Sequence, residues 1–288
     1  MSDATSDGKR DAPERQSGPD APHYDRIAEG YARHWGPVIR PAAESVLELA
    51  PLLAAGSARL LDIGTGTGTL ALAALERFPH VVVTGVDPSS AMLEIARSEA
   101  RRRLPPTART RLRLEVAPAA RLPFPAGSFD VVVSSFVLQL VPSRAAALRE
   151  ARRVLRRGGQ IAWVSWLTGG GSFRGDQVVD DVFDEFGFDP PEPDGRSGDI
   201  ASQGSAATAT RQAGFRAVRA TAGELEHQWD AQSYTAFISQ FDEESLFAEL
   251  EKDERRRLEA RLLERLGKLS PEELTYRLPT VSVTGRVP

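Results

Sequence analysis

The sequence predicts a doubly wound α/β fold with a mostly parallel sheet of seven strands. Short apolar segments alternate with amphipathic helical segments between residues 59 and 166, a pattern typical of parallel sheets covered by helices on both faces. A glycine-rich turn separates the first strand from the helix that follows it. The chain has 288 residues, of which 41% are hydrophobic, and this is enough for one large α/β domain.

The periodicity of apolar residues places each element. Two helices are expected first, at Tyr24–Trp35 and Pro41–Ala55. The strands are expected at Arg59–Ile63, Val81–Val86, Arg111–Val116, Phe129–Ser134, Gln160–Ser165, Arg216–Trp229 and Leu274–Val283. Further helices are expected at Thr69–Phe78, Ser89–Arg103, Ser143–Leu155, Val178–Phe186 and Ser245–Leu269.

Composition limits the partners and the compartment. A net charge of −4 gives no general attraction to nucleic acid or to an anionic membrane, and no apolar run approaches the roughly 20 residues that cross a bilayer. Because the chain has no cysteine, disulfides, thiolate nucleophiles and cysteine-ligated zinc are excluded, and a cytoplasmic location is expected. Residues 1–21 are polar, and we expect them to be a disordered tail.

The glycine-rich turn lies in the segment LLDIGTGTGTL, residues 60–70. Glycines at such a turn let a ligand approach the backbone. A dinucleotide site requires the spacing G-x-G-x-x-G, but here Gly64 and Gly66 are followed by Thr69 at the third position. Asp62, at the strand end, would repel a pyrophosphate and suits a ligand with an ammonium group. S-adenosylmethionine has an ammonium, a sulfonium and no phosphate.

A second carboxylate, Asp87, ends the next strand in VVVTGVDPSS. An acidic residue at this place can accept both ribose hydroxyls of an adenosine ligand. The alternative is that Asp87 caps the helix that begins near Ser89. Pro88 and Met92 would form an apolar wall for an adenine, although Met92 also fits plain core packing.

Four ordered segments carry a resemblance to a known family. The segments are Leu60–Leu70, Val81–Arg97, Leu122–Leu140 (LPFPAGSFDVVVSSFVLQL) and Ala145–Trp166 (AAALREARRVLRRGGQIAWVSW). They resemble the class I S-adenosylmethionine-dependent methyltransferases, and most of all the methyltransferase type 11 group that includes the ubiquinone and menaquinone biosynthesis C-methyltransferases. This resemblance implies a Rossmann-like methyltransferase fold, with S-adenosyl-L-methionine as cofactor.

Carried over residue by residue, the resemblance implies a set of cofactor contacts. The methionine part would lie on the glycine turn, the ribose at Asp87, the adenine against the turn Pro118–Ala120, and the ammonium near backbone carbonyls after the fourth strand. The full set is Asp62, Gly64, Thr65, Gly66, Gly68, Asp87, Pro88, Met92, Ala119, Ser134, Ser135 and Tyr31. The family often has Asp where this chain has Pro118, and histidines where it has Gln139 and Leu140.

The resemblance also implies that residues 22–56 are lid helices and that 167–245 is a variable insertion beside the substrate, within one methyltransferase domain at 22–288. Tyr24, Tyr31 and Trp35 are spaced by seven and four residues, so they share one helix face. They form either a packed stripe or a lid in which Tyr31 closes over the cofactor. His34 lies off this face and is expected at the surface. The candidate catalytic residues are Tyr24, Tyr31, His34 and Gln139, and no metal site is expected.

The sequence therefore predicts methyl transfer from S-adenosylmethionine to an O, N or C nucleophile of a small-molecule acceptor, of quinone, phenolic or natural-product type. The protein is expected as a monomer or a homodimer, without a nucleic-acid partner and without membrane insertion. A methyltransferase acting on RNA or protein and a non-catalytic S-adenosylmethionine-binding protein are the alternatives. A nicotinamide oxidoreductase is disfavoured by the glycine spacing and by Asp62.

Overall fold

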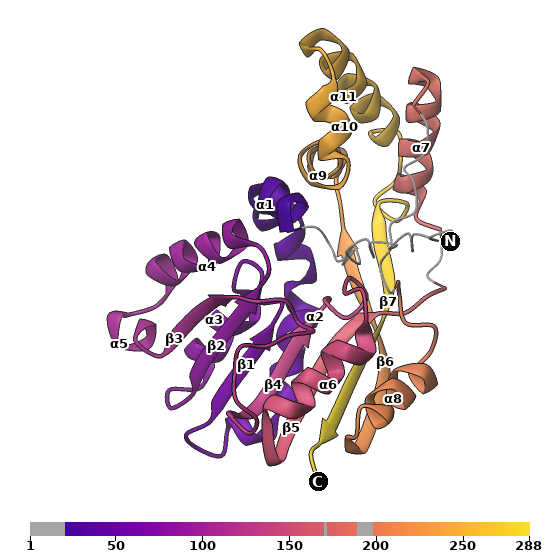
Figure 1. The fold of residues 1–288 in the computed structure, drawn as a ribbon. Helices are drawn as coiled ribbons and strands as arrows, with labels where there is room; N and C mark the ends of the chain where they lie inside the picture. The colour runs from indigo at the N-terminus through magenta and orange to yellow at the C-terminus, as the bar shows by residue number, and fades with distance from the viewer. Residues whose placement is uncertain (1–20, 170–171, 189–197) are drawn as a thin grey trace, which may run out of the picture.

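The computed structural model describes residues 21–169, 172–188 and 198–288. Its centre is a seven-stranded sheet in the order β3-β2-β1-β4-β5-β7-β6 (Figure 1). The strands from β3 to β5 run parallel to their neighbours, and β7 runs antiparallel to both β5 and β6. The strands are β1 (Arg59–Ile63), β2 (Val82–Asp87), β3 (Leu112–Val116), β4 (Phe129–Ser135), β5 (Leu155–Trp166), β6 (Arg216–Gln228) and β7 (Thr275–Arg286). The predicted fold class is confirmed.

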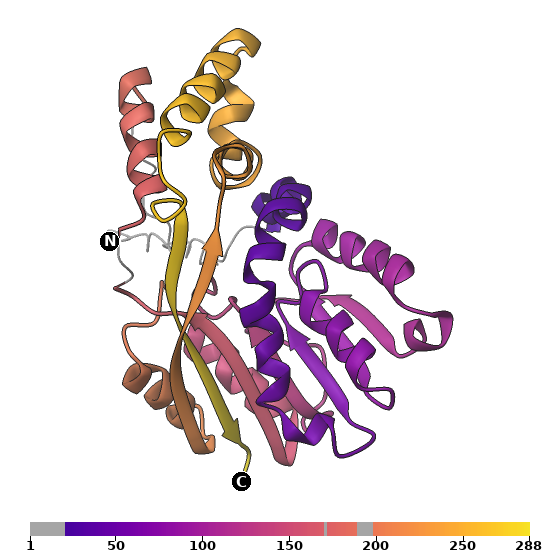
Figure 2. The same cartoon turned by 180° about the vertical axis from the view of Figure 1, so that it is seen from behind.

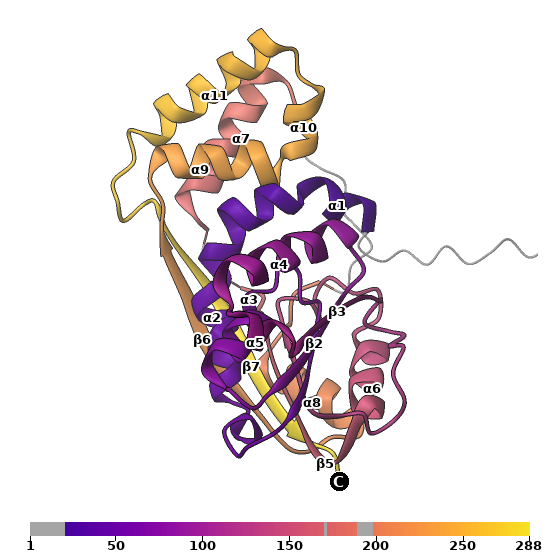
Figure 3. The same cartoon turned by 90° about the vertical axis from the view of Figure 1, so that its left-hand side faces the viewer.

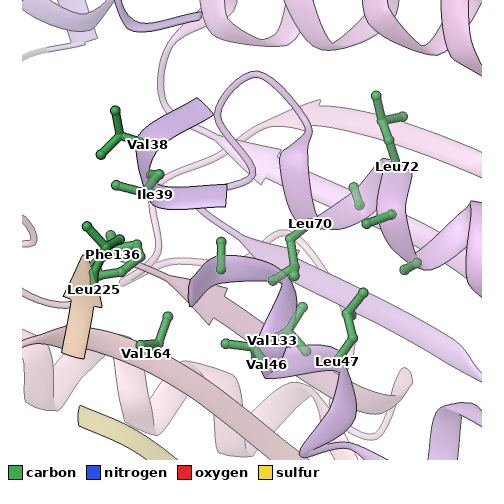
Figure 4. Packing of buried hydrophobic residues seen from close by; sticks show 14 of the residues in the cluster. Val38, Ile39, Val46, Leu47, Leu70, Leu72, Val133, Phe136, Val164 and Leu225 are labelled. Carbon is green, nitrogen blue, oxygen red and sulfur yellow. The ribbon is translucent and has the colours of Figure 1, made fainter. Parts of the chain in front are cut away.

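Helices cover both faces of the sheet and form two hydrophobic layers. The first layer contains α2 (Gly36–Glu48), α3 (Thr69–Arg77), α4 (Ser90–Arg103) and the short α5 (Pro106–Arg109), and the second contains α6 (Arg144–Val154) and α8 (Gln203–Gln212). Figure 4 shows part of the first layer, where Val46 of α2 and Leu70 of α3 lie among Val133 of β4 and Val164 of β5. These strands are apolar on both faces, as expected for strands buried between two helical layers.

A group of helices stands beyond the carboxyl ends of the parallel strands (Figures 1 and 3). These cap helices are α7 (Arg174–Phe186), α9 (Ala231–Phe237), the π-helix η3 (Ile238–Asp242), α10 (Glu244–Glu249) and α11 (Lys252–Leu266). The inner face of α11 buries Leu258, Leu262 and Leu266, while its outer arginines pair with acids of α7, as in Arg261–Glu185 at 2.7 Å. The long strands β6 and β7 extend beyond the parallel strands and connect to these helices (Figure 1).

The N-terminal helices differ from the prediction. The expected helix Tyr24–Trp35 consists of α1 (Ala21–Gly30) and the π-helix η1 (Tyr31–Trp35). The next helix, α2, starts at Gly36, contains Pro41 and ends at Glu48, and the 3-10 helix η2 (Pro51–Leu53) follows. A β-carbon on Gly30 would lie 1.9 Å from the carbonyl oxygen of Gln240, so glycine permits the close approach of α1 to η3.

Several short helices were not predicted, among them α5, α8, α9 and η3, and one long helix was predicted as continuous. Both α8 and α9 begin with a capping box, at Ser202–Ser205 and at Asp230–Ser233, but its third residue is serine and not the Glu or Gln that marks such a start in a sequence. The predicted helix Ser245–Leu269 is divided into α10 and α11 at Leu250. The expected tail at 1–21 lies, except for residue 21, outside the described residues, and 167–245 is described only in part. None of the described helices is both long and apolar enough to span a bilayer.

Candidate active site

The glycine turn joins β1 to α3. The backbone N–H groups of Gly64 and Thr65 both donate to the carbonyl of Val86, at 2.8 and 2.9 Å, which holds the turn against the end of β2. Gly64, Gly66 and Gly68 all have positive φ, where a side chain is strained. A β-carbon on Gly64 would collide with Val137 at 2.2 Å, whereas one on Gly66 would have no atom within 4 Å. The Gly66 backbone therefore faces open space that a ligand can occupy.

Asp62 lies directly beneath this turn and is only 1% exposed. Its Oδ2 accepts a hydrogen bond of 2.7 Å from the Thr65 hydroxyl, but its Oδ1 is buried without a hydrogen-bond partner. Burial is the main cause that raises the pKa of Asp62 to about 7, and the nearby charge of Asp87 contributes to the same shift. An ionised carboxylate in this position requires a positively charged or hydrogen-bond-donating partner.

Asp87 ends β2 and ties three elements together. Its Oδ2 accepts from the backbone N–H of Gly66 at 2.9 Å, and its Oδ1 accepts from the backbone N–H of Ser89 at 2.9 Å. Burial raises the pKa of Asp87 to about 6 despite these two hydrogen bonds. The helix cap of α4 is Ser89, whose hydroxyl accepts from the N–H of Met92 at 3.1 Å, so Asp87 is not itself the cap.

The helix α1 is joined to the same corner by a residue that sequence reasoning missed. The Ser89 hydroxyl donates to Asp25 Oδ1 at 2.6 Å, and the N–H of Ala91 donates to the same oxygen at 3.0 Å. These bonds hold the pKa of Asp25 below its ordinary value. Asp25 is separated from Ser89 by 64 positions, and no local motif in the sequence signals this contact.

The aromatic residues of α1 and η1 have different surroundings. Burial raises the pKa of the Tyr31 hydroxyl above its ordinary value, and the charges of Tyr24, Asp87 and Asp62 raise it further. Tyr31 thus lies close enough to both buried carboxylates to sense them, and Tyr24 lies close to Tyr31. Trp35 instead packs into an aromatic cluster, with ring centroids 5.3 Å from Phe237 and 6.0 Å from Trp166.

The residues expected around the adenine and the ammonium lie at neighbouring strand ends. Met92 is 2% exposed and Ala119 8% exposed, and the backbone N–H of Ala117 donates to the Asp87 carbonyl at 3.1 Å. The turn that contains Ala119 is therefore held beside Asp87. Ser134 is buried, and its hydroxyl donates to the Ile63 carbonyl at 2.9 Å, so this side chain fastens β4 to β1. Ser135, next in the chain, is half-buried, as is Pro88.

Gln139 and His34, two of the candidate catalytic residues, form side-chain contacts that join neighbouring segments of the protein. The Gln139 amide is buried, with Nε2 donating to the Phe136 carbonyl at 2.8 Å and Oε1 accepting from the Ser165 hydroxyl at 2.7 Å. It therefore fixes the loop after β4. His34 was expected at the surface, but it is half-buried, and its Nε2 lies 3.1 Å from Gln240 Oε1. This contact joins η1 to η3.

The loop that Gln139 holds contains a strained residue. Phe136 has φ +55°, a left-handed conformation that is rare for a bulky side chain, and its ring stacks on Trp166 with centroids 4.0 Å apart. Strained residues cluster at functional sites because their surroundings must hold them in place. This stacked pair stands at the carboxyl ends of β4 and β5.

The site is negative and lacks a counter-charge. Within the described ranges, no lysine, arginine or histidine makes an ion pair or a hydrogen bond with Asp62 or Asp87. In the ligand-free protein, two buried carboxylates with raised pKa values and no neighbouring cation lower the free energy of unfolding. A cationic ligand would supply the missing charge.

Substitution at Asp62 tests this electrostatic account. Asp62→Asn should raise the free energy of unfolding of the ligand-free protein at pH 8 by about 1–3 kcal/mol, because it removes an uncompensated buried charge of similar shape. The folded-state pKa of about 7 lies well above the ordinary value of 3.8 for an aspartate, so the cost of the charge is full above pH 7 and disappears as the pH falls toward 4. Urea unfolding measured from pH 5 to 8 should show the gain shrinking with acidity.

The matched control is Asp130→Asn, since Arg156 and Arg59 lower the pKa of Asp130 in the folded state. This substitution should destabilise the protein at the same pH values. A loss of stability at pH 8 in Asp62→Asn would contradict the account.

Comparisons with known proteins agree with this geometry. Residues 61–163 match the family described as methyltransferase domain. The ubiquinone/menaquinone biosynthesis C-methyltransferase of a Geobacter species is 37% identical over 114 residues, which cover 39% of this chain and 47% of that protein. The demethylmenaquinone methyltransferase of Thermus thermophilus is 38% identical over 145 residues, which cover 49% of this chain and 60% of that protein.

The chain thus spans about half the length of the curated relatives that it matches. Among solved structures, the YcgJ protein of Bacillus subtilis is similar, with a TM-score of 0.55 and 19% identity over 84% of this chain and 98% of that chain, a likeness that shows the fold alone. The segment 61–163, which carries the glycine turn and both buried carboxylates, therefore matches the methyltransferase domain family, and the resemblance predicted from the sequence is confirmed.

Proposed function

We propose that this protein transfers a methyl group from S-adenosylmethionine to an O, N or C nucleophile of a small-molecule acceptor. The observation that carries this proposal is the pair of buried carboxylates beside an open glycine turn. Asp62 has one oxygen without a partner, and neither carboxylate has a cation among the described residues. A ligand with an ammonium and a sulfonium fits this site, whereas a pyrophosphate would be repelled.

The chain's residues fit the parts of the cofactor separately. Asp62 would pair with the ammonium, and the open side of Gly66 leaves room for the methionine chain. Each Asp87 oxygen accepts one backbone hydrogen bond and retains capacity for a ribose hydroxyl. Met92 and Ala119 would flank the adenine. When bound, S-adenosylmethionine supplies a methyl group already activated by its sulfonium, so the protein's task is mainly to align the acceptor.

The aromatic cluster supports a planar acceptor. Trp166 of β5, Phe237 of α9 and Phe241 of η3 all pack against Trp35 of η1, and Phe136 stacks on Trp166. The cluster lies at the carboxyl ends of the strands, where ligands of open α/β sheets bind. Tyr31 touches this cluster through Phe241, at 5.7 Å between ring centroids. The relatives named above are methyltransferases of quinone biosynthesis. A quinone, phenol or related natural product is therefore the acceptor class that we propose.

The proton that a phenol must lose requires a base, and Tyr31 does not fit this role. Burial keeps Tyr31 protonated, so it can donate a hydrogen bond but cannot accept a proton at neutral pH. We propose Asp242, which follows Phe241 in η3, as this base. It is an exposed residue, and partial desolvation by the surrounding protein, together with the charges of Glu243 and Asp176, raises its pKa above the ordinary value. A general base works best with a pKa near the operating pH.

The N-terminal residues 22–56 act, in this proposal, as a lid over the cofactor, within one domain that begins near residue 22. Asp25 fastens α1 to the start of α4, and Ser89 connects this contact to Asp87. The lid and the ribose site are therefore parts of one hydrogen-bonded chain. The cysteine-free sequence favours a cytoplasmic enzyme, which we expect to work as a monomer or a homodimer.

Cofactor binding is tested first with Asp87→Ala. Loss of a charged hydrogen-bond partner should weaken S-adenosylmethionine binding by about 1.5–3 kcal/mol, measured by calorimetry. The control is Asp130→Ala. Asp130 lies near the amino end of β4, whereas Asp87 lies at the carboxyl end of β2, so this substitution should leave the affinity unchanged. Equal affinity in Asp87→Ala and the wild type would remove Asp87 from the cofactor site.

Turnover is tested with labelled cofactor and a panel of quinones, phenols, amines and hydroxylated polyketides. With a phenolic acceptor, Asp242→Asn should lower kcat by about 10²-fold or more and leave cofactor affinity intact, while Glu243→Gln should have a small effect. Binding of the cofactor without turnover of any acceptor would favour a non-catalytic binding protein. Methylation of RNA or protein in the same assay would favour the other alternative.

The lid is tested with Asp25→Ala. Loss of a contact of helix-cap type should weaken the attachment of α1 by about 0.5–2 kcal/mol, so amide exchange in Ala21–Gly30 should become faster and S-adenosylhomocysteine should dissociate sooner. Glu29→Ala, on the same helix, serves as the control. If both variants exchange and release ligand like the wild type, α1 is not held by Asp25.

A further inference from the structure

A cavity lies away from the glycine turn, on the face of β6 and β7 beside the end of α2. Its volume is about 470 Å³. Figure 2 shows this face, where α2 covers the middle of the sheet and the lower halves of β6 and β7 have no helix in front of them. Leu49 and Pro51 form the wall on the side of α2, and the floor comes from the strands.

The floor is made by small and hydroxylated side chains that the strand register places on one face. Arg219 lies opposite Thr284, and Thr221 lies opposite Ser282, across β6 and β7. Ala217 has φ +51° and sits where the pairing of β6 with β7 shifts register. With Phe136, it is one of two residues other than glycine with a positive φ in the described chain. Apart from Arg219, these side chains are short, so they leave space for a ligand above the strands.

Gln160 lines this cavity and has an unused hydrogen-bond acceptor. The residue is 5% exposed. The Nε2 group donates to the Leu49 carbonyl at 2.7 Å, which fixes the orientation of the amide. The Oε1 atom is buried and has no hydrogen-bond partner. An unpaired buried acceptor is costly, so a ligand N–H or O–H at this point would be stabilising.

The rim supplies positive charge without a counter-ion. Arg219 and Arg286 both line the cavity and are exposed, and Arg286 lies opposite Gln160 in the β5–β7 register. Neither arginine makes an ion pair or a hydrogen bond within the described residues, in contrast to Arg261 and Arg265 of α11. Two unpaired guanidinium groups beside a buried acceptor favour an anion that also carries a donor.

The cavity is separate from the proposed cofactor site. Gln160 pairs with Val131, which in turn pairs with Leu60, near the amino end of β1. The glycine turn begins after Ile63, at the carboxyl end of the same strand. The two sites thus lie at opposite ends of the strands, and a ligand in this cavity would bind independently of the cofactor.

We propose that this cavity is a binding site for a small organic anion, a carboxylate or a phosphate ester, that also bears a hydroxyl or amino group. The arginines would hold the anionic group, and Gln160 Oε1 would accept the hydrogen bond from the hydroxyl or amine. The hydroxyls of Thr221, Ser282 and Thr284 line the remaining floor.

Calorimetry and amide chemical shifts of the full-length protein test this site. The probes are glycerate, glycerol 3-phosphate and inorganic phosphate. The first two carry both an anionic group and an alcohol, and their comparison distinguishes a carboxylate from a phosphate ester. We expect at least one of them to bind more tightly than inorganic phosphate and to shift the amides of Thr221 and Thr284. Arg219→Ala and Arg286→Ala should each weaken that binding by about tenfold or more.

Arg113→Ala, on the strand at the far edge of the sheet, is the control and should leave binding unchanged. The proposal would be overturned by the absence of binding of every probe at concentrations up to about 20 mM, a dissociation constant that corresponds to a binding free energy of roughly 2 kcal/mol. Equal binding in the arginine variants, or chemical shifts confined to the glycine turn, would overturn it as well. A dimer that Arg286→Ala dissolves, without anion binding, would also overturn it and assign the face to a second copy of the chain.

Discussion

The carboxylate of Asp87 is the contact on which the candidate site depends. It accepts one hydrogen bond from the glycine turn and another from the residue that caps α4, so a single side chain fixes three backbone segments at the edge of the sheet. Through Ser89 the same arrangement reaches Asp25 and places α1 above the turn. The open side of Gly66, the nearby Tyr31 hydroxyl and the turn around Ala119 all take their positions from this corner.

The same corner is electrostatically unfavourable without a ligand. Asp62 and Asp87 are both buried, and burial is the main cause that raises the pKa of each. The charge of Asp87 raises the pKa of Asp62 further, and the charge of Asp25 does the same for Asp87. Proteins retain such arrangements where function needs them, because replacing a buried charge is often neutral or stabilising. The missing positive charge is therefore the strongest physical argument for a cationic cofactor. Hydrogen bonds from Thr65, Gly66 and Ser89 reduce the cost but do not remove it.

The match to the methyltransferase domain family does not identify the acceptor, because the cap helices lie outside the matched segment. The family match ends at residue 163, whereas most of the aromatic cluster and Asp242 come from η1, the end of β5, α9 and η3. A shared fold does not fix a shared substrate, because specificity lies in the residues built onto the fold. Two π-helical segments, η1 and η3, meet at this cluster, and such segments are often found at functional sites.

The sequence alone determined the order of strands and helices, the glycine turn and the two strand-end carboxylates. These features follow from local signals: apolar periodicity, positive-φ glycines and acidic residues at the ends of buried strands. The sequence did not determine the π-helical turn at Tyr31, the short helices α8 and α9, or the division of the last long helix at Leu250, because short helices depend on tertiary packing more than on propensity.

Only the tertiary structure decided how distant residues combine. In the folded protein Asp25 accepts a hydrogen bond from Ser89, and His34 lies within hydrogen-bond distance of Gln240. The buried Gln139 amide bonds to both Phe136 and Ser165. It also left Gln160 Oε1 unpaired beside a cavity. These contacts join positions that are far apart in the chain or depend on which face of an element is covered. Neither composition nor periodicity encodes such information, since both describe a residue only with respect to its neighbours in sequence.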